Sequence, residues 1–159
     1  MIVISDSSSL IAIAAVGHLE VLRGLYGEVI VPQAVWSEVT QPNRPGAAEI
    51  QGAAWIRVTS ITDRSLINGL PHPVGVGEAE AIVLAQELRA DLLLIDERRA
   101  RKTALELGLP VTGLLGVLLE AKKAGLISAL KPILDQMEAV VAFRLKRSLY
   151  EAALRAAGE

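Results

Sequence analysis

The stretch Leu92-Leu93-Leu94-Ile95-Asp96 is a short apolar run that ends in an aspartate, and the run Ile2-Val3-Ile4-Ser5-Asp6 has the same form. Each run has the length and composition of a buried strand, and a helical pattern follows each at once. In an alternating α/β protein, such positions lie at the carboxyl edge of the sheet, where ligands bind. Asp6 and Asp96 are therefore predicted to meet in space.

The remaining chain extends this alternation of strands and helices. Strands are predicted at residues 2–5, 29–31, 55–58, 92–95 and 111–112. Helices are predicted at 7–16, 18–26, 33–40, 47–52, 78–90, 97–107, 113–124, 128–141 and 146–157. Ser7, Ser8 and Ser9 are expected to cap the first helix, and residues 63–77, rich in proline and glycine, are expected to be irregular. The order predicts a three-layer α/β/α fold with a central, mostly parallel sheet of about five strands.

Length and composition indicate a single domain. The 159 residues are 52% apolar and 21% charged, which suits a globular chain with a core. Residues 1–159 are predicted to form one unit, with helices over 128–157 packed on it or used for association. Because the net charge is −2, any nucleic-acid binding must come from a local basic patch.

The residue types that are scarce restrict the chemistry. The chain has no cysteine and only two histidines, which excludes disulfides, thiol nucleophiles, cysteine-ligated zinc and multi-histidine metal sites. Carboxylate oxygens remain, and they suit hard ions such as Mg²⁺ and Mn²⁺. The start of the chain lacks the features of a signal peptide, and no apolar stretch is long enough for a membrane span. We therefore expect a cytoplasmic protein without membrane association.

Four carboxylates stand out by position. Asp6 and Asp96 end strands, Glu38 lies in the helix after the second strand, and Glu78 lies in the first turn of an apolar helix. Glu78 and Glu80 lie about 200° apart around that helix, so we expect Glu78 on the packed side and Glu80 on the wetter side. Clustered carboxylates repel one another and require a cation. Such a site favours attack of a metal-activated water on a phosphodiester.

Each acid also has a structural interpretation. Asp6 could cap the first helix, and Asp96 could cap the helix that begins at residue 97. Glu78 could interact with the helix dipole, and Glu38 could be an ordinary surface residue. Glu97 and Arg101 have the spacing of an i,i+4 ion pair.

Four of the five residues directly after Glu97 are basic, in Arg98-Arg99-Ala100-Arg101-Lys102. Beside an acidic metal site, such a patch could bind a nucleic-acid backbone. A solvated helix face with local ion pairs is the alternative.

In these features the chain resembles the PIN-domain family of metal-dependent nucleases, and among them the VapC-like toxin ribonucleases. The resemblance covers most of residues 2–125. It rests on the stretches Asp6-Ser7-Ser8-Ser9-Leu10-Ile11, Val35-Trp36-Ser37-Glu38-Val39, Gly77-Glu78-Ala79-Glu80-Ala81-Ile82-Val83-Leu84-Ala85, Ile95-Asp96-Glu97-Arg98-Arg99-Ala100-Arg101 and Gly113-Leu114-Leu115-Gly116.

The resemblance implies an acidic catalytic site made of Asp6, Glu38, Glu78 and Asp96. Asp6 and Asp96 would bind Mg²⁺ or Mn²⁺ directly, Glu78 would complete the set of ligands, and Glu38 would act through water or a second ion. RNA is the implied substrate, a small antitoxin protein the implied partner, and a homodimer the implied assembly. The candidate substrate-binding residues are Ser7, Arg98, Arg101 and Lys102.

The chain departs from this family pattern at two positions. Leu94 stands where many VapC-like members have a threonine or serine, and Glu78 stands where the third acid is often an aspartate. Glu97 could supply a further ligand. The alternative function is therefore a PIN-like domain that binds RNA or a protein partner without cutting.

Overall fold

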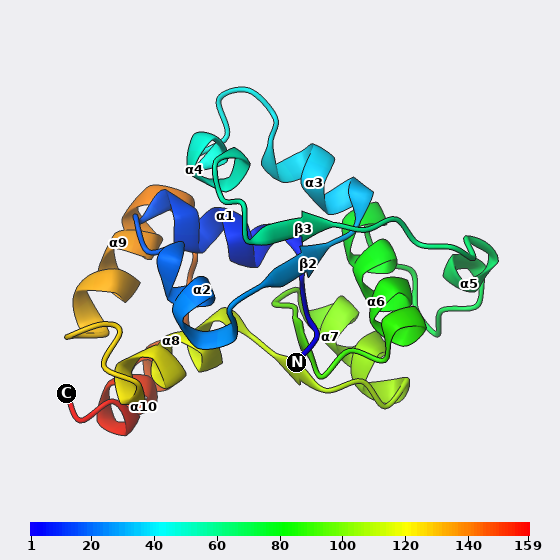
Figure 1. Ribbon diagram of the computed structural model, residues 1–159. Helices are drawn as coiled ribbons and strands as arrows, with labels where there is room; N and C mark the ends of the chain where they lie inside the picture. The colour runs from blue at the N-terminus through cyan, green and yellow to red at the C-terminus, as the bar shows by residue number, and fades with distance from the viewer.

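The computed structural model describes residues 1–159 and contains a five-stranded sheet in the order β3-β2-β1-β4-β5 (Figure 1). Every neighbouring pair of strands is parallel, and β1 pairs with β4 in the register Val3↔Leu92, Ile4↔Leu93 and Ser5↔Leu94. The strands are β1 (Val3–Ser5), β2 (Val29–Val31), β3 (Ile56–Val58), β4 (Leu92–Leu94) and β5 (Val111–Thr112).

Ten helices connect and cover these strands. They are α1 (Ser7–Ala15), α2 (Glu20–Tyr26), α3 (Gln33–Val39), α4 (Ala47–Gln51), α5 (Ser65–Asn68), α6 (Val76–Leu88), α7 (Arg98–Glu106), α8 (Leu114–Lys123), α9 (Lys131–Val141) and α10 (Arg147–Ala156). Each predicted strand and helix is present, with bounds shifted by three residues or fewer. The prediction that residues 63–77 are irregular is wrong in part, because this stretch contains α5 and the first residues of α6.

The two faces of the sheet have different helical covers. Successive strand side chains point to opposite faces. Val3 and Leu94 pack into a larger core with α1, α2, α8 and α9. Ile4 and Leu93 pack into a smaller core with α6 and α7 on the other face. The predicted three-layer α/β/α fold is confirmed.

The C-terminal helices contribute to the larger core. In α9, Ile133, Leu134 and Met137 are buried, whereas in α10 only Ala153 is buried and Leu149 is 48% exposed. The connection between them places Phe143 against the same core. No single helix is long and apolar enough to cross a membrane, and α1 and α2 pass that test only as a pair bent by 119°.

The strand order places one crevice at a defined point. The chain leaves β1 toward β2 on one side, and β4 adds later on the other side of β1. The carboxyl ends of β1 and β4 therefore flank the switch point of the sheet, where open α/β sheets bind their ligands. Asp6 directly follows β1, and Asp96 lies two residues beyond β4.

Candidate active site

Asp6 and Asp96 lie in direct contact at this switch point. The backbone N–H of Asp96 donates to Oδ2 of Asp6 at 3.1 Å. The Asp6 N–H in turn donates to the carbonyl of Leu94 at 2.9 Å. The Ser9 hydroxyl donates to Oδ2 of Asp96 at 3.0 Å. The predicted meeting of the two strand-end aspartates is thus observed.

Asp6 also caps α1, as its structural interpretation proposed. Its Oδ1 accepts a hydrogen bond from the N–H of Ser9 at 2.9 Å, and its Oδ2 accepts one from the Ser8 hydroxyl at 3.2 Å. The expectation that the serines themselves cap the helix is therefore wrong. The aspartate is the better acceptor for a helix N–H because it is charged and precedes the first helical residue.

Asp96 does not cap α7. The residue after it, Glu97, accepts from the N–H groups of Arg99 and Ala100 at 3.1 and 2.7 Å. Asp96 instead accepts from the N–H of Leu114, the first residue of α8, at 3.0 and 3.2 Å through its two oxygens. The N-cap of α7 is therefore Glu97, whose backbone is extended, while the Asp96 carboxylate faces the beginning of α8.

Burial dominates the electrostatics of Asp6. The side chain is 1% exposed, and this burial raises the pKa of Asp6 to about 6. The hydrogen bonds from Ser9 and from the Asp96 N–H lower this pKa, and the negative charge of Asp96 raises it slightly. Neither aspartate forms a salt bridge with a side chain of this protein. The pair therefore concentrates negative charge without a cation from the chain.

Glu38 lies beside this pair through Ser7. The Ser7 hydroxyl donates to Oε2 of Glu38 at 2.8 Å, and Arg44 lies 3.7 Å from Oε1. A Cβ at Gly77 would lie 3.4 Å from both Oε2 of Glu38 and Oγ of Ser7. Glu38 is thus a half-exposed acid at the site, and Ser7, predicted to bind substrate, is buried and holds it in place.

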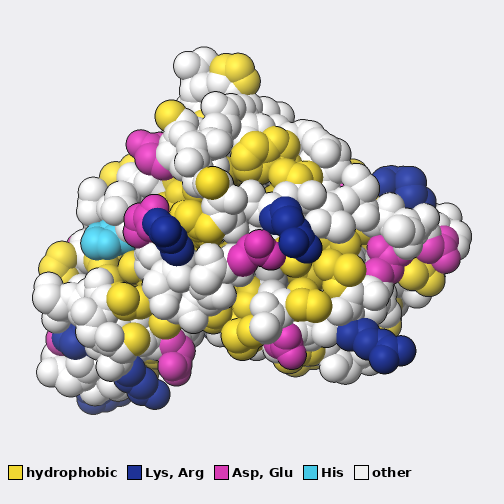
Figure 2. Space-filling view, viewed as in Figure 1, with side chains coloured by type: hydrophobic (Ala, Val, Ile, Leu, Met, Phe, Trp, Pro, Cys, Tyr) yellow, Lys and Arg dark blue, Asp and Glu magenta, His cyan; other side chains and the backbone are white.

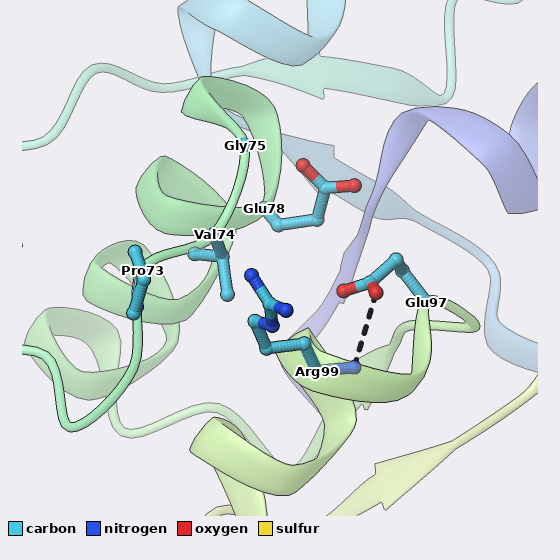
Figure 3. Close-up of a pocket in the computed structure, with 6 residues that line it drawn as sticks. All are labelled: Pro73, Val74, Gly75, Glu78, Glu97 and Arg99. Atoms are coloured by element: carbon cyan, nitrogen blue, oxygen red, sulfur yellow. Dashed lines mark hydrogen bonds between the residues drawn. The ribbon is translucent and has the colours of Figure 1, made fainter.

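Glu78 lies at the edge of a separate cavity of about 320 Å³. Figure 3 shows Glu78 on α6 opposite Glu97 and Arg99 at the beginning of α7, and all three residues line this cavity. The Glu78 carboxylate folds back against Gly75, so that a Cβ at Gly75 would displace it. Glu78 and Glu97 therefore face the same cavity, whereas Asp96 does not line it.

The expected roles of Glu78 and Glu80 are reversed. Glu80 is 6% exposed and accepts hydrogen bonds from the Ala34 N–H and the Arg64 side chain, both at 3.0 Å. It thereby caps α3, whose preceding residue Pro32 provides no side-chain cap. Glu78 is only half-buried. Because α6 is buried around nearly its whole circumference, its small residues could not indicate which glutamate faced the interior.

The basic residues after Glu97 point in different directions. Arg98 and Lys102 line a polar cavity of about 360 Å³ together with Arg99, Glu97 and His72. Arg101 turns to the other side and donates to the carbonyl of Ile95 at 3.1 Å. The expected ion pair between Glu97 and Arg101 is therefore absent.

Charged side chains of both signs are mixed on the face of the molecule that Figure 2 shows. Figure 2, seen from the side of β3, shows Lys and Arg side chains interspersed with Asp and Glu and separated by hydrophobic side chains. This face has no field of a single sign. The basic side chains of α7 are thus a local feature, as the net charge of −2 requires.

The aspartate pair fits a divalent cation chemically. No three acidic, histidine or cysteine side chains are grouped so that they could hold one ion together, so the triad of Asp6, Glu78 and Asp96 is not assembled in this structure. Mg²⁺ commonly uses only one or two carboxylates, with waters and substrate phosphate oxygens as its other ligands. Each aspartate accepts hydrogen bonds but keeps lone pairs free, since a carboxylate offers about four.

Some residues of the site were not identified from the sequence. Ser9 and Gly113 lie beside Asp96, and a Cβ at Gly113 would lie 2.6 Å from its Oδ1. The spacing of Ser9, three residues after a helix-capping acid, was a usable signal. Leu94 turned out to lie 1% exposed in the core, and the Ser9 hydroxyl lies next to Asp96 from α1 instead.

Comparison with known proteins agrees with this architecture. The family model described as DUF3368: PIN domain matches residues 2–159. Among solved structures, a PilT N-terminus domain protein from the hyperthermophilic archaeon Sulfolobus solfataricus P2 is similar, with 20% sequence identity and a TM-score of 0.53. The match covers 76% of this chain and 93% of that protein, and at this identity it shows the fold alone. No curated protein matches the chain. Because the family model extends over nearly the whole chain, the protein belongs to the PIN-domain family, whose members are generally nucleases that use divalent metal ions.

Proposed function

We propose that the protein is an Mg²⁺- or Mn²⁺-dependent endoribonuclease that hydrolyses RNA phosphodiester bonds. The observation that carries this proposal is the contact between Asp6 and Asp96, two carboxylates at the switch point of the sheet without a cation from the chain. An ionised carboxylate as buried as Asp6 is unfavourable unless a cation compensates it. A bound metal ion provides that compensation.

Asp6 and Asp96 would hold the metal ion directly, and Glu78 and Glu38 are proposed as further acids of the site. When bound, the ion supplies a Lewis acid for the phosphate and a water of lowered pKa as nucleophile. The chain's own residues set the arrangement. Ser9 and the Leu114 N–H hold the Asp96 carboxylate, and Ser7 holds Glu38.

The basic residues of α7 would position the RNA backbone. Arg99 lines the cavity of Glu78, whereas Arg101 lines a different cavity, which Asp96 also lines. Guanidinium groups bind phosphate oxygens in a bidentate manner, so these two would bind phosphates on either side of the reacting one. Arg98 and Lys102 would extend this contact along the RNA backbone. RNA rather than DNA is proposed on the resemblance to VapC-like ribonucleases.

Cleavage of RNA by purified protein tests this proposal. We expect the wild type to cut single-stranded and structured RNAs with Mg²⁺ or Mn²⁺ and to stop when the ion is chelated. Asp96→Asn should lower the rate about 100-fold or more, because several kcal/mol of transition-state stabilisation depend on the ion. Asp91→Asn is the matched control, since Asp91 lies at the opposite end of the same strand and is exposed.

Each outcome has a distinct meaning. A wild type that is inert on diverse RNAs with either ion would favour the alternative, a PIN domain that binds without cutting. An Asp96→Asn variant as active as the wild type would refute the site. Mg²⁺ should also raise the melting temperature of the wild type more than that of Asp96→Asn, which tests metal binding without relying on activity.

We further propose that the protein is the toxin of a toxin-antitoxin pair, that it acts in the cytoplasm as a homodimer, and that a small protein inhibits it. The resemblance to VapC-like toxins supports this extension. Induced expression should arrest growth with the wild type and not with Asp96→Asn. Sedimentation of the purified protein would test the dimer. Growth unaffected by an active nuclease would instead indicate a housekeeping enzyme.

A further inference from the structure

A second cavity adjoins Asp96 on the side away from Glu78. It measures about 550 Å³, within the range of about 300–1,000 Å³ common for small-molecule sites. Its walls come from three separate parts of the chain: the start of α7, the β5–α8 connection, and the segment between α9 and α10. Asp96 and Arg101 stand in one wall, and Phe143 and Arg144 in another.

The side chains of this cavity combine an aromatic ring with cations. Phe143 is the only phenylalanine of the chain and is half-buried, so part of its ring is fixed against the core and part lines the cavity. Arg144 is exposed and forms no salt bridge. Arg101 uses one of its N–H groups on the Ile95 carbonyl and keeps the others.

We infer that this cavity binds the nucleotide next to the scissile phosphate of single-stranded RNA, with its base stacked on Phe143 and its phosphate bound by Arg144 and Arg101. The inference rests on the proposed function, because it takes the reacting phosphate to lie at Asp6 and Asp96. Proteins recognise single-stranded RNA by unstacked bases on aromatic side chains and by arginines along the backbone.

The position of Asp96 favours a nucleotide over a segment of protein. Asp96 is shared between the aspartate pair and this cavity, so a chain held at the pair reaches the cavity directly. The cavity also brings two arginines to a net acidic protein, which suits a polyanion. Both arginines and Phe143 would contact one nucleotide in an unpaired strand, whereas a paired base would be unavailable for stacking.

RNA binding, measured under conditions that prevent cleavage, tests whether a base stacks on the Phe143 ring. Fluorescence anisotropy of a labelled single-stranded RNA of mixed sequence, with the divalent ion chelated, compares the wild type with Phe143→Leu. Stacking on one aromatic side chain corresponds to a weakening of roughly 5- to 150-fold when it is lost. Phe143→Trp should bind at least as well as the wild type. Tyr150→Leu is the matched control, because it removes an aromatic ring from the same C-terminal region outside the cavity.

An abasic RNA locates the contact. An oligonucleotide lacking the base beside the cleavage position should bind the wild type more weakly than the intact one. The Phe143→Leu variant should bind the abasic and the intact oligonucleotide equally well, because the ring that would stack on that base is already missing. An equal loss in both proteins would place the base elsewhere. Melting temperatures of all variants show whether they are folded.

The results separate this inference from the proposed function. If the wild type cuts RNA but Phe143→Leu binds and cuts equally well, the cavity is not a nucleotide site, whereas the nuclease stands. If the wild type binds RNA through Phe143 but never cuts, the cavity stands and the nuclease does not. Equal affinity for single-stranded and duplex RNA would overturn the stacking contact.

Discussion

The N–H of Asp96 donates a hydrogen bond to the carboxylate of Asp6 from a position 90 residues further along the chain. Two structural requirements are met by this one bond. The β1–β4 pairing continues one step beyond the strands, and an acceptor is provided for an N–H at the buried edge. Asp6 therefore has a structural task as helix cap and strand anchor as well as its proposed task at the metal ion.

The first prediction concerns the charge of Asp6. Its pKa in the folded protein is about 6, above the ordinary 3.8, so the folded state binds the proton more tightly between those values. In the absence of metal ions, its contribution makes the free energy of unfolding fall by about 3 kcal/mol as pH rises from about 4 to about 6. This contribution becomes constant about one pH unit above the folded-state pKa.

Asp6→Asn should remove this pH dependence and abolish cleavage. Its amide oxygen can still accept from the Ser9 N–H, whereas its NH2 group donates at the place where the carboxylate accepted from the Ser8 hydroxyl and the Asp96 N–H. We expect a net stabilisation of about 1–2 kcal/mol above pH 6, measured by urea unfolding of both proteins in chelator. A wild-type minus variant difference that does not vary with pH would contradict the raised pKa.

The second prediction concerns Gly113. A methyl group there would lie 2.6 Å from Oδ1 of Asp96 and 2.7 Å from the Arg101 guanidinium. Gly113→Ala should therefore displace the Asp96 carboxylate and lower cleavage at least about tenfold, since misplaced catalytic groups lose rate steeply. The protein should stay folded by circular dichroism. Gly69→Ala is the control, because its added methyl meets only an ordinary contact at 3.7 Å.

The third prediction concerns Glu80. Glu80→Ala should destabilise the protein by about 1–2 kcal/mol, because it removes the cap of α3 and an ion pair with the largely exposed Arg64. Hydrogen exchange of the Ala34 amide should accelerate. Glu80→Gln keeps an acceptor for the Ala34 N–H and should destabilise the protein less than Glu80→Ala does. Equal effects of the two variants would show that the hydrogen bond to Ala34 is unimportant.

The fourth prediction concerns Thr103. Its side chain is completely buried in α7, and its hydroxyl has no hydrogen-bond partner. Valine has the same shape without the hydroxyl, so Thr103→Val should stabilise the protein by about 1 kcal/mol. Thermal unfolding measures this gain, and cleavage should not change. A destabilised variant would mean that the hydroxyl does bind a partner in solution.

The sheet and its carboxyl edge were predictable because short apolar runs in the sequence indicate buried strands. The run before Asp96 and the run before Asp6 are such strands, and the parallel order that α/β alternation requires brings their ends together. The lengths of the helices were also predictable, because glycines and prolines in the sequence indicate where helices begin and end. The order of the strands in the sheet was not predicted, because the sequence of a strand does not indicate which distant strand it pairs with.

Side-chain direction was the less predictable part. Glu78 and Glu80 were assigned to the wrong sides, because a helix packed on nearly all faces shows no periodicity to read. The capping role of Glu97 was missed, because Asp96 is the stronger capping residue by type and only the later docking of α8 takes it away. Both errors come from neighbours contributed by other parts of the chain.

The separation of Asp6 from Asp96 also sets when the protein can work during its synthesis. A ribosome that has made β1, β2 and β3 has made Asp6 and Glu38, whereas Glu78, Asp96 and Leu114, which holds Asp96, are still to come. The nascent chain can bury its first strands early, yet its aspartate pair cannot form until about two thirds of the protein has emerged. On the proposed function, the nascent chain would therefore stay inactive toward the messenger and ribosomal RNA beside it while it is being made.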